Sequence, residues 1–210
     1  MILYLHGFAS GPESAKGRAL AERFAALGVP FERADLTPGA DGFERSTPLT
    51  MLAEAERLAA RLRPRAVMGS SLGGWLAAML SARAPSIQRL VLLAPAFRLF
   101  ERWRARIGPA EERAWREVGL EVDHHASRRK RRLGWAFMED AAKLPAFPPV
   151  EVPALCIAGR RDEVVPLEDV RAFVERTPSA RLVVLDDAHD LVASVDRIYE
   201  EAREFLSTVL

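Results

Sequence analysis

The stretch "VMGSSLGGWLAAML", residues 67–80, joins two patterns of different period. Its first half continues the unalternating apolar run "RAVMGSS" (65–71), which is typical of a strand buried on both faces of a parallel sheet. Residues 72–82 carry no charge and predict a helix that is covered on most sides. Between the two stands "GSSLG", a G-x-S-x-G motif centred on Ser71. A strand that turns sharply into a helix at such a motif exposes the serine side chain at the top of the sheet.

The motif is informative because it stands between a predicted buried strand and a predicted helix. With Gly and Ser each at about 7% of residues, a chain of this length carries the pattern by chance in roughly 7% of cases. Gly69 and Gly73 are expected where neighbouring backbone passes too close for a Cβ atom. The alternative interpretation of Ser71 is a structural serine in a turn.

Outward from this stretch, apolar runs alternate with segments of helical period. The alternation predicts one α/β domain over residues 1–210, with about six mostly parallel strands and helices on both faces of the sheet. The expected strands are 1–7, 30–36 (near an edge), 65–71, 89–96, 154–162 and 181–189. The expected helices are 13–27 with a capping box from Ser10 to Glu13, 48–62 capped by Ser46 or Thr47, 72–82, and a C-terminal helix over 191–209.

Residues 97–149 interrupt this rhythm. They hold helical patches, many charges and no convincing buried strand, so they predict an insertion between the fourth and fifth strands. Lys and Arg number 12 there against 8 Asp and Glu, with a basic run "RRKRR" at 128–132. The run is interpreted as a solvated face, as a contact for an anionic group such as the phosphates of an acyl-CoA, or, least favoured, as a nucleic-acid contact.

A serine hydroxyl becomes a nucleophile only when a base takes its proton. His189 follows the last expected strand in "LDDAHD", and Asp162 follows the preceding strand in "GRRDEVVP". Loops at the carboxyl ends of parallel strands lie at one edge of the sheet, which brings both residues to the side where Ser71 is expected. The chain order Ser71, Asp162, His189 is the nucleophile, acid and base order of this motif's architecture.

Other interpretations of these residues stay open at this point. Asp162 also suits a cap for a following helix, with Glu163 and Asp187 as substitute acids. His189 also suits a surface loop. The pair His124–His125 predicts no metal site, because adjacent strand residues point opposite ways and no further ligands converge on them in the sequence.

Acyl transfer to a serine places negative charge on the former carbonyl oxygen, which two backbone N–H groups must meet. Leu72, at the start of the helix after the nucleophile, is expected to supply one of them. Phe8, in "YLHGFAS" after the first strand, is expected to supply the other. His6 is then a structural residue that holds this loop by hydrogen bonds.

With these motifs, the chain resembles the α/β-hydrolases, and among them the small bacterial YqiA-like esterases. These proteins also open with "YLHGF", a Ser/Pro-containing loop and a lysine, here Lys16. The resemblance implies a three-layer α/β-hydrolase fold, a triad of Ser71, Asp162 and His189, and oxyanion donors at Phe8 and Leu72. The sequence departs from the family at "DAHD", where Gly-Asn-His is more common.

The resemblance also implies that the insertion 97–149 is a lid over the nucleophile. Its aromatic residues then form an apolar substrate pocket, or they only anchor a lid without its own core. The candidates for the pocket are Phe97, Phe100, Trp103, Trp135 and Phe137.

The sequence therefore predicts a serine hydrolase, a carboxylesterase or thioesterase acting on a small acyl ester or thioester without a cofactor. The alternatives are other chemistry on the same triad (amide or carbon–carbon hydrolysis, acyl transfer) or a catalytically silent binding protein. A net charge of +1 gives no drive toward nucleic acid or membrane surfaces. The single cysteine, Cys156, is expected in the core, and the protein is expected to be cytoplasmic, without stable membrane insertion, as a monomer or homodimer.

Overall fold

A six-stranded parallel sheet forms the centre of the molecule in the computed structural model, which describes residues 1–39 and 41–210. The strand order is β2-β1-β3-β4-β7-β8. The strands are β1 (Ile2–Leu5), β2 (Phe31–Arg33), β3 (Ala66–Ser70), β4 (Arg89–Leu93), β7 (Ala154–Gly159) and β8 (Ala180–Leu185). All five pairings are parallel, and every residue of β1, β3 and β7 is buried. Unalternating apolar strands are what this two-sided burial requires.

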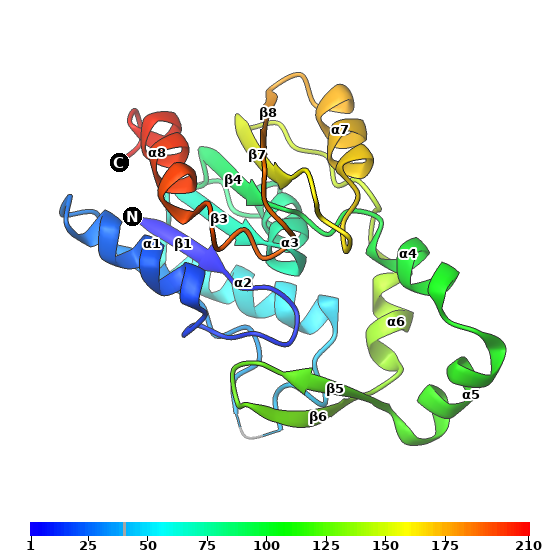
Figure 1. Ribbon diagram of the computed structural model, residues 1–210. Helices are drawn as coiled ribbons and strands as arrows, with labels where there is room; N and C mark the ends of the chain where they lie inside the picture. The colour runs from blue at the N-terminus through cyan, green and yellow to red at the C-terminus, as the bar shows by residue number, and fades with distance from the viewer. Residues whose placement is uncertain (40) are drawn as a thin grey trace.

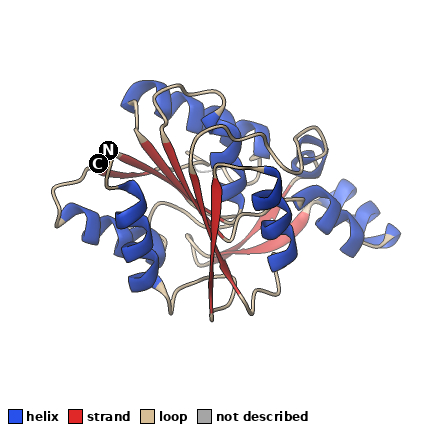
Figure 2. Ribbon diagram, turned by 90° about the horizontal axis from the view of Figure 1, so that it is seen from above, coloured by secondary structure: helices blue, strands red, loops and turns tan. Residues whose placement is uncertain are grey.

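Helices cover both faces of the sheet, as Figure 2 shows from above. Helices α1 (Ala15–Ala25) and α8 (Val195–Leu206) pack on one face, against a cluster that includes Ile2, Tyr4 and Met68. Helices α2 (Pro48–Leu62), α3 (Leu72–Ser81) and α7 (Leu167–Arg176) pack on the other. The predicted three-layer α/β architecture is therefore confirmed. In the described parts of the chain, no helix has the length and apolar character to cross a bilayer.

One predicted helix end agrees with the structure, and two others differ from it. Thr47 caps α2, its hydroxyl accepting from the Thr50 amide at 3.2 Å, which decides between Ser46 and Thr47. The expected capping box of Ser10 and Glu13 is wrong, because α1 begins at Ala15 with Ser14 before it. The C-terminal helix begins at Val195 rather than at residue 191, because Leu191 has a left-handed backbone (φ 52°).

The insertion lies between β4 and β7, as predicted, and occupies the green part of the ribbon in Figure 1. It consists of α4 (Leu99–Arg106), α5 (Pro109–Val118), the antiparallel hairpin β5 (Leu120–His124) and β6 (Arg129–Leu133), and α6 (Ala136–Ala141). The hairpin contains most of the basic run 128–132. It was not expected, since both strands are largely exposed and carry charges at most positions that face solvent.

Aromatic rings fix the insertion to the rest of the domain. Trp115 is buried and donates its indole N–H to the Leu133 carbonyl at 2.8 Å, joining α5 to the hairpin. Its ring lies 5.7 Å from that of Trp103, which lies 5.2 Å from Phe8 in the loop after β1. The rings therefore form a continuous row from the insertion to the loop at the carboxyl end of β1.

Candidate active site

Ser71 stands at the sharp turn between β3 and α3, with φ at 52°, a backbone conformation that non-glycine residues seldom adopt. The turn is possible only because of the glycines beside it. A Cβ atom on Gly69 would lie 2.2 Å from the Gly73 carbonyl oxygen, and one on Gly73 would lie 2.2 Å from the Leu5 carbonyl oxygen. This turn at Gly69–Gly73, called the elbow below, thus packs against the end of β1, and Ser71 is partly exposed above the sheet.

Three side chains from three loops form one hydrogen-bonded chain at this edge. His189 Nε2 lies 2.9 Å from Ser71 Oγ, and His189 Nδ1 lies 2.8 Å from Asp162 Oδ2. The loops after β3, β7 and β8 supply the three residues. The predicted residues are therefore brought together, in the contacts that a nucleophile, base and orienting acid require.

Asp162 is held by more than the imidazole. Its other oxygen, Oδ1, accepts from the amides of Val164 and Val165, both at 2.8 Å. Burial alone would raise the pKa of Asp162, but the hydrogen bonds from His189 and from these amides outweigh it and hold the pKa below its usual value. Asp162 therefore stays ionised and fixed in orientation.

The substitute acids do not reach the histidine. Asp187 accepts from the amide of its neighbour Ala188, and the side chain of Glu163 is exposed. Asp162 does cap the loop that precedes α7, although α7 itself begins only at Leu167. The two interpretations of Asp162 are thus compatible, with one oxygen serving each contact.

The loop after β1 lies directly beside the nucleophile. A Cβ atom on Gly7 would lie 3.3 Å from the Ser70 carbonyl oxygen and 3.4 Å from Ser71 Cβ. His6 ties the loop down, because its Nδ1 contacts the Gly7 carbonyl at 2.9 Å and its Nε2 accepts from the Leu36 amide at 3.3 Å. Burial lowers the pKa of His6, which favours the neutral imidazole that this pair of bonds requires.

The two expected oxyanion donors border the same space. Leu72 is the first residue of α3, so its amide has no partner four residues earlier within the helix. Phe8 follows Gly7, and both Phe8 and Leu72 line the cavity that contains Ser71 and His189. The next residue, Ala9, has a left-handed backbone with φ at 51°.

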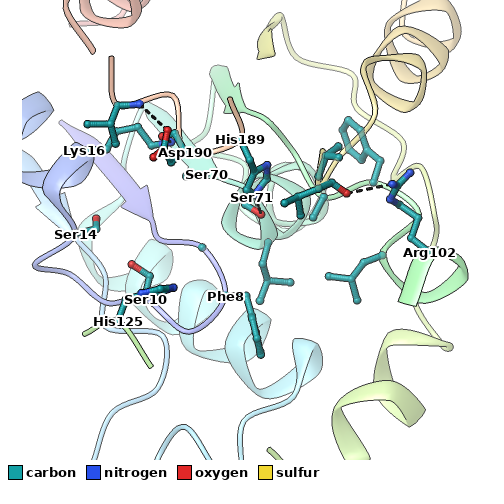
Figure 3. Close-up of a pocket in the computed structure, with 18 of the residues that line it drawn as sticks. Phe8, Ser10, Ser14, Lys16, Ser70, Ser71, Arg102, His125, His189 and Asp190 are labelled. Atoms are coloured by element: carbon teal, nitrogen blue, oxygen red, sulfur yellow. Dashed lines mark hydrogen bonds between the residues drawn. The ribbon is translucent and has the colours of Figure 1, made fainter. Parts of the chain in front are cut away.

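A cavity of about 480 Å³ opens above Ser71 and His189, and Figure 3 shows its lining. One side, toward the insertion, is largely apolar and includes Leu99, Val165 and the ring of Phe8. The other side, toward α1, is polar. Its residues are Tyr4, Ser10, Ser14, Lys16, Ser70, His125 and Asp190.

The five aromatic residues expected to form a substrate pocket differ in where the structure places them. Phe97 and Trp103 line the cavity. Phe100, Trp135 and Phe137 are not among the described residues that line it. Phe137 is fully buried behind Phe8 and Trp103, and Trp135 packs on Trp115 outside the cavity, so these two rings anchor the insertion.

The polar side of the cavity was missed as a group. In the sequence, Lys16 stands out only through the family resemblance, and Tyr4 and Ser70 fit the pattern of strand residues. A signal was present, because alternation along β1 and β3 points Tyr4 and Ser70 to the sheet face that α1 covers. Deciding which polar residues of the following loop meet them required the fold.

The two histidines of the pair His124–His125 lie in different surroundings. His124 is buried at the end of β5, its ring 4.5 Å from that of Phe43, while His125 lines the cavity and donates its amide N–H to the Ala9 carbonyl. Among residues 1–39 and 41–210, no three His, Cys, Asp or Glu side chains are grouped as a metal ion would need. Cys156 is buried in β7, as predicted.

Solved structures of other proteins share this architecture. The mouse Alpha/beta hydrolase domain-containing protein 10 superposes with a TM-score of 0.83 at 20% identity, covering 100% of this chain and 90% of its own. Est1E from Butyrivibrio proteoclasticus, in a structure with bound ferulic acid, gives 0.82 at 22% identity, covering 99% and 88%. A monoacylglycerol lipase from Paleococcus ferrophilus gives 0.73 at 16% identity, covering 99% and 93%. At these identities the likeness shows the α/β-hydrolase fold.

Two sequence comparisons gave different results, one against curated proteins and one against models of protein families. No curated protein matches it. The model of the family described as "Uncharacterised protein family (UPF0227)" matches residues 1–207. The chain, with its α/β-hydrolase fold, therefore belongs to the UPF0227 family.

Proposed function

We propose that the protein is a serine hydrolase that cleaves carboxylic esters or thioesters. One observation carries this proposal: the unbroken chain of contacts from Ser71 Oγ through His189 to Asp162, open to a cavity of substrate size. A binding protein would have no use for a strained serine in contact with a histidine that a buried carboxylate orients.

In the first half of the reaction, Ser71 Oγ attacks the acyl carbon while His189 Nε2 takes the hydroxyl proton. Asp162 stabilises the imidazolium that forms and keeps Nε2 turned toward Ser71. The amides of Leu72 and Phe8 donate to the developing oxyanion, and the N-terminal end of α3 favours its negative charge. The tetrahedral intermediate then collapses, and the alcohol or thiol leaves with the proton from His189.

In the second half, water enters the space that the leaving group vacated. His189 takes a proton from the water as it attacks the acyl-enzyme, and a second oxyanion forms at the same two amides. Collapse of this intermediate returns the proton to Ser71 and releases the carboxylic acid. The cycle needs no group beyond those of the chain and water.

The insertion serves as a lid in this proposal. Phe97, Leu99 and Trp103 supply an apolar wall above the nucleophile, suited to the hydrocarbon part of an ester. The neighbour Est1E, which binds ferulic acid, supports a small carboxylic acid as the kind of product such a cavity can hold.

Ser71→Ala tests the proposal. We expect the variant to lose at least about a thousandfold in kcat/KM on p-nitrophenyl butyrate, with an unchanged circular dichroism spectrum. A fluorophosphonate probe should label the wild type at Ser71 and leave the variant unlabelled. Ser81→Ala, in which the lost hydroxyl only donates to the Ala78 carbonyl within α3, is the matched control. An unlabelled wild type, or full turnover by Ser71→Ala, would reject the proposal.

A further inference from the structure

The polar side of the cavity contains a buried ammonium group that the proposed mechanism does not use. Lys16, in the first turn of α1, is 8% exposed, whereas the other two lysines, Lys130 and Lys143, are exposed and paired with Glu121 and Asp140. Lys16 Nζ donates to the Asp190 carbonyl at 2.7 Å. In the described residues, no carboxylate oxygen lies within 4.0 Å of Lys16 Nζ. A buried charge without an ion-pair partner is costly.

The surroundings of Lys16 contain both carboxylates and hydroxyl groups. Burial lowers the pKa of Lys16 to about 8, partly offset by the charges of Asp190, Asp187 and Asp162, so most molecules carry the ammonium at neutral pH. The Tyr4 hydroxyl faces those of Ser14 and Ser70, and burial raises the pKa of Tyr4 to about 12, which keeps the phenol proton in place.

Two polar features at the start of α1 have no partner. Ser14 Oγ is buried and meets hydrogen-bond geometry with no group in the described chain. Although Ser14 is the residue before α1, its side chain does not cap the helix, and the first turn contains no acidic residue. The N–H groups that begin a helix favour a negative charge, and the residues of this first turn supply none.

These groups share one cavity with the nucleophile. Figure 3 shows Ser10, Ser14 and Lys16 on one side of Ser71 and His189, and Arg102 on the opposite side. A ligand bound at Ser71 can therefore extend toward α1. The Lys16 ammonium, the hydroxyl groups of Ser14 and Tyr4, and a helix N-terminus together match an acceptor-only anion the size of a carboxylate.

We propose that Lys16, Ser14 and Tyr4 form a subsite for a carboxylate carried by the substrate. This inference rests on the proposed function and adds a substrate class to it, namely esters with a free carboxylate at a distance from the bond that is cleaved. The carboxylate belongs either to the acyl part or to the alcohol part of the ester, and both present the same chemistry to Lys16.

Two matched substrate pairs test the subsite. Monoethyl adipate differs from ethyl hexanoate by a carboxylate in place of the terminal methyl group of the acyl part. In the same way, 4-carboxyphenyl butyrate carries a carboxylate on the leaving group that phenyl butyrate lacks. For at least one pair, we expect the wild type to show about tenfold higher kcat/KM on the carboxylate member, as for a charge-assisted hydrogen bond. Preference for both neutral members would overturn the inference.

Variants assign that preference to the subsite. Lys16→Met should reduce the ratio of the two kcat/KM values to about one, and Ser14→Ala should reduce it about threefold while keeping the lysine. Lys143→Met removes an exposed charge that Asp140 neutralises, and it should leave the ratio unchanged. A ratio that survives in Lys16→Met would overturn the inference.

Binding separates this inference from the proposed function. Ser71→Ala retains the subsite but not the nucleophile, so titration calorimetry with monoethyl adipate and 4-carboxyphenyl butyrate requires no catalysis. We expect about tenfold tighter binding of at least one of them than of its neutral partner. Equal binding in each pair, with the wild type still labelled at Ser71, would reject the subsite and leave the hydrolase intact. Selective binding by a protein that the probe does not label would do the reverse.

Discussion

The sheet edge and the insertion 97–149 border the same cavity but are stabilised in different ways. The strands that precede Ser71 and Asp162 are fully buried and lie inside the sheet, each between two neighbouring strands. The insertion has a small two-stranded sheet with mostly exposed residues, and its helices are tied by rings and surface ion pairs. The comparison teaches that the candidate reacting groups lie on loops of the buried sheet, whereas the more exposed insertion only borders their cavity.

The sharpest test of this comparison is Asp162→Asn. The amide keeps the shape of the side chain but cannot stabilise the imidazolium, and it favours the wrong tautomer of His189. We expect kcat/KM for p-nitrophenyl butyrate to fall about a thousandfold, with little change in KM. Steady-state kinetics of the purified variant measure this.

Glu163→Gln is the matched control, because it changes the neighbouring, exposed carboxylate in the same chemical way. It should keep activity within about twofold, as for a surface substitution away from any partner. Equal losses in the two variants would mean that the loop, and not the contact with His189, matters.

Trp103→Ala addresses the insertion. Trp103 lines the cavity and contacts the rings of Phe8, Trp115 and Phe137, so its loss opens the apolar wall. We expect kcat/KM for p-nitrophenyl hexanoate to fall about tenfold or more, with a smaller loss for the acetate, since the longer chain buries more apolar surface. A series of acyl chain lengths measures the difference.

Trp135→Ala provides the comparison within the insertion. Trp135 packs on Trp115 and under the Arg116 guanidinium, and it does not line the cavity. Both variants lose stability, but only Trp103→Ala should change the dependence on chain length. The same change in both would assign the effect to disorder of the whole insertion.

The smallest expected effect comes from Arg131→Gln. Arg131 joins the hairpin to Glu44 through a partly exposed ion pair, a contact worth less than about 1 kcal/mol. We expect amide hydrogen exchange in β5 and β6 to accelerate several-fold while β3 and β4 keep their rates. Lys130→Met, which breaks the more exposed pair with Glu121, should do less. A uniform change across the main sheet would show that hairpin and sheet unfold as one unit.

The parts that were predictable from sequence are those where local pattern and burial agree. β3, Ser71 and α3 were placed from one stretch of 14 residues, because a strand buried on both faces shows no alternation and the elbow needs glycines. The hairpin was missed for the opposite reason. Its strands expose most of their length, so charges mask the alternation of Leu120, Val122 and His124, which turn toward the protein.

The sequence by itself determined the six strands of the main sheet, the helices α1, α2, α3 and α8, and the elbow at Ser71. It also determined the edge where Asp162 and His189 lie, since carboxyl-end loops of parallel strands meet at one rim. Only the tertiary structure decided that Asp162 rather than Asp187 holds the imidazole, which rings line the cavity, and that Lys16 is buried beside the nucleophile. These outcomes depend on contacts between segments up to 174 residues apart, as between Lys16 and Asp190, and no local pattern encodes which side chains meet across such a distance.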